Sequence, residues 1–119
     1  MAKIKLTANS LTVLLSAGEK LAAFHGNLTV PIDQVVSAQI VPNSFWRGLG
    51  LRVPGTGLPP FIVSGTYLKK GDRAFVSYFK GQIPVEIKLS GGRFTRLIIG
   101  TDDLAAAGAA VETLSLARG

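Results

Sequence analysis

The sequence predicts a mainly β domain: seven to eight short strands in a bent antiparallel barrel or sandwich, a short internal helix, and a C-terminal helix that caps the open end. Two observations predict this fold class. Four β-rich runs in the second half are separated by glycine-containing turns, and the C-terminal end has apolar residues at helical spacing. A chain of 119 residues, 47% hydrophobic and 17% charged, suits a single globular domain over residues 1–119.

The N-terminal part predicts a hairpin followed by the short helix. Apolar and polar residues alternate over Lys3–Ala8 and again over Leu11–Leu15, with a turn between the two runs. Ser16 stands three residues before Glu19, which is the spacing of a capping box. We therefore expect a helix over Ala17–Phe24.

The middle of the chain predicts two strands and a long loop. The strands are Leu28–Pro31 and Val35–Val41, and the first lies at an edge or end because proline cannot donate to a strand ladder. The loop, Pro42–Pro60, has about nineteen residues, and ordered loops of that length are often functional.

Within this loop, Gly48–Pro60 holds four glycines and three prolines and resembles a phosphate-binding loop. Gly50 and Gly55 have the right spacing, but the lysine of such a loop is missing and prolines stand where a helix would begin. Nucleotide binding is therefore not expected. Two interpretations of the loop stay open: a structural loop that closes one barrel end, or a surface for a protein partner. The candidate partner-binding residues are Trp46, Arg47 and Arg52.

The second half predicts an antiparallel four-stranded meander. Its turns are Gly71-Asp72, Gly81-Gln82 and Gly91-Gly92, each with glycine where a tight hairpin needs positive φ. The β-rich runs are Phe61–Leu68, Ala74–Phe79, Pro84–Leu89 and Phe94–Ile99.

The C-terminal end predicts an amphipathic helix over Thr101–Leu116. Thr101, Asp102 and Asp103 supply a cap and two carboxylates that suit the positive end of the helix dipole. The expected apolar stripe is Leu104, Ala107, Val111 and Leu114.

The strand order, this helix and the segment Gly50–Pro59 resemble the pleckstrin-homology-like superfold, and within it small single-domain bacterial proteins of actinobacterial type. The resemblance implies a module that binds phosphoinositides, peptides, proteins or itself. Phosphoinositide-binding members carry basic residues on the first hairpin. Here Leu11–Leu15 has none and only Lys3 and Lys5 precede it, so phosphoinositide recognition is not expected.

The net charge of +6 favours an anionic partner, although solubility alone would also explain it. Lys69, Lys70 and Arg73 surround a predicted turn and are the candidate contacts to an anionic surface. Because turns of a meander alternate between ends, Lys80 is expected at the opposite end and Arg93 at the same end as Lys69. The alternative is a solvated turn that discourages pairing between sheet edges.

Catalysis is not expected. The chain has no cysteine, and one histidine, His25, with seven scattered carboxylates gives no metal cluster. No catalytic motif or cofactor-binding motif is present, and no run approaches the roughly 18 apolar residues of a membrane helix.

The sequence therefore predicts a non-catalytic binding or scaffolding module that acts through protein contacts, self-association included. The alternative is peripheral binding to acidic membrane through the basic turn. A third, disfavoured possibility is nucleic-acid binding. The expected location is the cytoplasm, at the membrane surface in the alternative.

Overall fold

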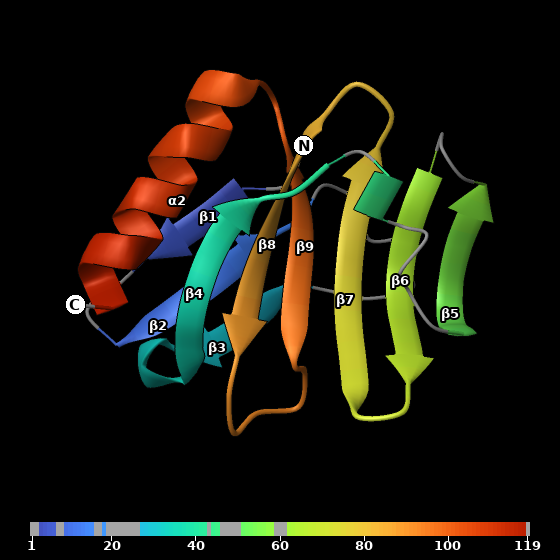
Figure 1. The fold of residues 1–119 in the computed structure, drawn as a ribbon, viewed down its shortest axis with the longest axis horizontal. Coiled ribbons are helices and arrows are strands. Elements are labelled where there is room, and N and C mark those ends of the chain that lie inside the picture. Colours follow the sequence, from blue (N-terminus) through green and yellow to red (C-terminus); the bar gives the residue numbers. More distant parts are fainter. Residues whose placement is uncertain are drawn as a thin grey trace.

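The computed structural model describes residues 3–6, 9–15, 18, 27–42, 44–45, 51–58 and 62–118. Within these ranges the chain forms nine strands in two sheets, two 3-10 segments, one of them at Ser44 and Phe45, and a C-terminal helix (Figure 1). The three-stranded sheet is ordered β1 (Lys3–Leu6), β2 (Ser10–Leu14) and β3 (Leu28–Pro31). The six-stranded sheet is ordered β4 (Val35–Ile40), β8 (Ile83–Leu89), β9 (Arg96–Thr101), β7 (Asp72–Phe79), β6 (Ile62–Lys69) and β5 (Leu51–Leu58). The remaining elements are η1 (Ile32–Gln34) and α2 (Leu104–Arg118).

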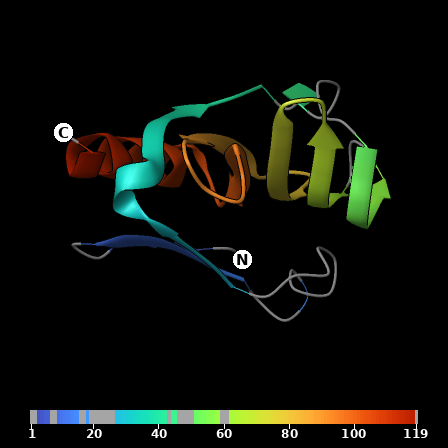
Figure 2. The same cartoon turned by 90° about the horizontal axis from the view of Figure 1, so that it is seen from below.

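The two sheets form separate layers rather than a closed barrel (Figure 2). The mainly β class and the C-terminal helix are confirmed. Of the two predicted arrangements, a barrel or a sandwich, the barrel is wrong, and the described strands number nine rather than seven to eight. The reason lies at η1, where three residues carry the chain out of β3 in one layer and into β4 in the other. Among the described strands, no ladder joins one sheet to the other.

The first hairpin and the two strands after it are confirmed. β1 and β2 pair antiparallel from Lys3↔Leu14 to Leu6↔Leu11, and β3 pairs with the other side of β2. The predicted helix Ala17–Phe24 lies, apart from Gly18, outside the described residues.

The predicted four-stranded meander is wrong in its order. The β6–β7 and β8–β9 hairpins form, but β9 lies between β7 and β8 and pairs with β7 in parallel. Gly81 has the expected positive φ of 98°, yet its turn does not close a hairpin. Instead the turn is closed by two local hydrogen bonds: Gln82 N donates to Phe79 O, and Phe79 N donates to Gln82 Oε1 at 2.8 Å.

The sequence of β9 explains its central place. Leu97, Ile98 and Ile99 are three consecutive apolar residues, and all are 0% exposed. A strand buried on both faces has such a run, whereas a strand with one solvent face alternates. β9 therefore fits between two neighbours better than at the sheet edge where a meander would place it.

β5 replaces part of the predicted loop Pro42–Pro60. Leu51–Leu58 pairs antiparallel with β6, with a register shift between Arg52 and Gly55. Pro54 lies in that irregular stretch and at the outermost strand, the two settings in which a strand tolerates proline. The glycine-rich segment is thus in large part an edge strand rather than a loop.

Both faces of the six-stranded sheet bury apolar side chains. The face toward β2 and β3 holds the larger cluster, in which Phe75 and Phe94 meet edge to face at 5.9 Å between ring centroids. The outer face holds a smaller cluster around Tyr78, against which Phe45 packs at 5.1 Å. Phe75 and Tyr78, both in β7, therefore point to opposite faces of the sheet.

Helix α2 packs on β4, β8 and η1 and completes the larger cluster. Asp103 is its cap, because Asp103 Oδ1 accepts a hydrogen bond from Ala106 N at 2.8 Å. Ala107 and Leu114 are buried as expected, but Leu104 is 67% exposed. Leu104 is the first helical residue, and the stripe turns toward the sheet only after it.

Candidate anionic-surface site

Two turns meet at one end of the six-stranded sheet. Since β7 and β9 are parallel neighbours, the β6–β7 turn and the β8–β9 turn precede them at the same end (Figure 1). Thr95 N donates to Arg73 O at 2.8 Å, and Arg73 N donates to Thr95 Oγ1 at 2.9 Å. These bonds fix the turns side by side.

The two turns and the strands beside them carry five exposed cations, which we call the basic end. The β6–β7 turn supplies three of them, and the β8–β9 hairpin supplies the other two. The five residues are Lys69, Lys70, Arg73, Lys88 and Arg93. The expectation that Arg93 shares an end with Lys69 is confirmed, and Lys80 lies at the opposite end.

Lys88 was not among the sequence candidates. It pairs in register with Arg96, the first residue of β9, and so lies close to the β8–β9 turn. Its signal in the sequence was the alternation of β8, in which Val85, Ile87 and Leu89 point inward and Lys88 outward. That pattern shows exposure but not which end of the sheet the lysine shares.

Behind the basic end, Arg96 holds two carboxylates on the outer face of the sheet. Its Nε and Nη2 reach both oxygens of Asp72, the closest at 2.8 Å, and its Nη1 donates to Glu86 Oε2 at 3.1 Å. Thr95 Oγ1 donates to Asp72 Oδ1, and Gln39 Nε2 donates to Glu86 Oε1 at 3.2 Å. The network ties β4, β8, β9 and β7 together.

The network shifts the pKa values of Asp72 and Arg96. Burial raises the pKa of Asp72, but hydrogen bonds from Arg96 and Thr95 and the charge of Arg96 outweigh it, so the pKa lies below its ordinary value of 3.8. Burial lowers the pKa of Arg96, but its bonds with Asp72 and Glu86 outweigh that effect and raise it. Arg96 is thus the main partner of both carboxylates, with a further contribution to Asp72 from the charge of Lys69, and the single charge of Arg96 offsets one of the two negative charges.

The surrounding charges leave the basic end strongly positive. Among the described residues, Asp33 in η1 is the exposed carboxylate at this end, where Gln34 O accepts from Ser90 N of the β8–β9 turn. At the other end Asp102 and Asp103 accompany Lys80.

The other sequence candidates are placed only in part. Trp46 and Arg47 lie outside the described residues, as does His25. Arg52 lies in β5, in register with Tyr67, two residues before Lys69. The backbone of Arg52 is therefore near the basic end.

Comparison with known proteins finds no family model that matches the chain and no curated protein or solved structure with significant similarity. In the described part of the chain, no group of three or more His, Cys, Asp or Glu side chains could hold a metal ion. Over the same ranges, no helix has the length and hydropathy needed to span a bilayer. The functional assignment thus rests on the geometry of the basic end.

Proposed function

We propose that this protein is a non-catalytic binding module whose basic end docks on an anionic membrane surface. The observation that carries the proposal is the gathering of five exposed cations around two turns that are bonded to each other. Near an anionic lipid surface each lysine or arginine contributes about 1 kcal/mol, so five together are enough for reversible association.

A membrane fits this end better than a nucleic acid. Single-strand binders stack bases on exposed aromatic side chains of a sheet face. Phe75 is 0% and Tyr78 is 2% exposed, so these aromatic side chains of β7 have little surface for stacking. The cations lie on two neighbouring turns and on the strand ends beside them, so they can approach a flat surface together.

A second candidate is a protein contact through β5, with self-association as its simplest form. β5 is the last strand of the six-stranded sheet, and among the described residues no strand pairs with its outer side. An unpaired edge is a template for strand addition. Pro54 and the register shift beside it weaken that template, so we rank this candidate second.

Flotation with liposomes tests the proposal. The purified protein is mixed with neutral or anionic vesicles at low and at physiological salt. We expect flotation with anionic vesicles alone, weakened at physiological salt because surface charges are screened beyond about 8 Å. Equal flotation with neutral vesicles, or none with anionic vesicles at low salt, would refute membrane docking. Light scattering of the protein as it elutes from a size-exclusion column gives its molar mass and so decides whether it self-associates.

A further inference from the structure

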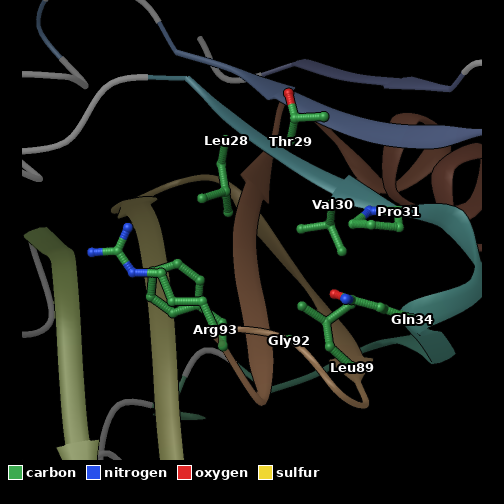
Figure 3. Close-up of a pocket in the computed structure, with 9 residues that line it drawn as sticks. Leu28, Thr29, Val30, Pro31, Gln34, Leu89, Gly92 and Arg93 are labelled. Carbon is green, nitrogen blue, oxygen red and sulfur yellow. The ribbon is translucent and has the colours of Figure 1, made fainter.

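A cavity of about 250 Å³ opens beside the basic end, between β3 and the β8–β9 turn (Figure 3). Val30 points down from β3 and Leu89 points up from β8, so the two side chains face each other across it. Both belong to the larger apolar cluster and are 6% and 8% exposed. The cavity is thus an opening into the apolar layer between the sheets.

The two ends of this cavity are chemically different. At one end lies Gln34, whose side-chain amide packs on Gly92 so closely that a Cβ at Gly92 would collide with it. At the other end, beside Leu28, lies the guanidinium of Arg93, 5.5 Å from the centre of the Phe94 ring (Figure 3). The cavity therefore has a closed polar end, an apolar middle and a cationic end.

We propose that this cavity binds a free medium-chain fatty acid, with the alkyl chain between β3 and β8 and the carboxylate against Arg93. The site goes beyond membrane docking and does not depend on it, since a monomeric amphiphile reaches it from solution.

The volume of the cavity limits the length of the alkyl chain that fits. A water molecule in the liquid takes about 30 Å³, and a methylene group is of similar size, so 250 Å³ holds a chain of roughly eight carbons. Burying each methylene contributes about 0.8 kcal/mol. The space is too small for the two chains of a phospholipid.

The charge selects the head group. A guanidinium matches a carboxylate with two parallel hydrogen bonds. That of Arg93 lies over the Phe94 ring, within the range of a cation–π interaction. Lys69, Lys70 and Arg73 lie at the same end and add a positive field. Asp33, the exposed carboxylate of η1, belongs to the element that carries Gln34, at the opposite end of the cavity from Arg93.

The test uses octanoate below its micelle concentration, with 1-octanol as the uncharged control ligand. Calorimetry compares the wild-type protein with Val30→Phe, which fills the cavity, Arg93→Gln, which removes the cation, and the control Lys80→Gln at the far end. We expect Val30→Phe to weaken both ligands by about tenfold or more. Arg93→Gln should weaken octanoate about tenfold and octanol far less. Lys80→Gln should match the wild type.

Three results would overturn the proposal. They are no octanoate binding by the wild type, unchanged affinity in Val30→Phe, or an equal loss of affinity for octanoate and for octanol in Arg93→Gln. Should Val30→Phe fail to fold, NMR chemical-shift changes of the wild-type backbone amides on addition of octanoate still test the site. They should concentrate at Leu28, Val30 and Leu89, and shifts elsewhere would refute the site. Liposome flotation of Val30→Phe should be normal, which separates this site from membrane docking.

Discussion

At the basic end of the six-stranded sheet, five cations are exposed around two linked turns, whereas at the opposite end the part of the chain that the structure describes carries Lys80, Asp102 and Asp103. At the opposite end one of these charged residues stabilises the fold, because Asp103 caps α2. At the basic end the cation that stabilises the fold is Arg96, which is partly buried and forms ion pairs with Asp72 and Glu86. The exposed cations of the basic end are thus accessible to a partner, whereas Arg96 is engaged within the sheet.

The largest expected effect comes from neutralising the β6–β7 turn. The triple variant Lys69→Gln, Lys70→Gln and Arg73→Gln should weaken binding to anionic vesicles about 100-fold, since each cation contributes about 1 kcal/mol there. Its thermal unfolding should match the wild type, since all three residues are exposed. The matched control is Lys80→Gln. If Lys80→Gln weakens binding as much per charge removed as the triple variant does, only net charge matters and not the end that carries it.

The next largest effect is on stability. Arg96→Met removes the partner of Asp72 and of Glu86, which is 7% exposed. We expect a loss of about 2 kcal/mol in the free energy of unfolding, because two carboxylates are left without their cation in a partly buried site. Urea denaturation measures it. A loss below about 0.5 kcal/mol would mean that the network contributes no more than an exposed ion pair.

At the opposite end, Asp103→Ala should cost about 1 kcal/mol through the lost cap of α2. Urea denaturation measures this loss, with the exposed neighbour Asp102→Ala as control. Vesicle binding should not weaken, because the change is far from the basic end and removes a negative charge. If Asp102→Ala costs as much, the cap is not the cause.

The smallest effect is a pH dependence. The pKa of Asp72 is lower in the folded than in the unfolded chain, so its contribution to stability is complete above its ordinary value of 3.8 and is lost as the pH falls through the lowered value. We expect the free energy of unfolding to drop as the pH falls below about 4. Urea denaturation at several pH values measures the drop. In Asp72→Asn it should be smaller, and an equal drop would exclude Asp72 as its source.

Local structure was largely predictable from the sequence, while the order of strands was not. Alternation and turn glycines predict the β6–β7 and β8–β9 hairpins, and Gly71, Gly81 and Gly91 all have positive φ. A positive φ fixes a turn but not the partner of the next strand, so the insertion of β9 was missed. The continuous apolar run of Leu97–Ile99 was the available signal.

The same limit applies to the site. Lys69, Lys70 and Arg73 were found because they surround one local turn. Lys88 and the bonds of Arg96 to Asp72 and Glu86 depend on registers between β7, β8 and β9, which the sequence does not specify. β5 was missed because proline and glycine, which usually break strands, are tolerated at an edge.

The central claim is that the basic end, and not the opposite end, faces an anionic membrane. The chain has no cysteine, so Ser90→Cys in the β8–β9 turn and Asp102→Cys at the opposite end each accept one polarity-sensitive dye. Both positions are exposed. With anionic vesicles at low salt, we predict a blue shift of the dye at position 90 and none at position 102. Equal shifts, or a shift at position 102 alone, would contradict the account.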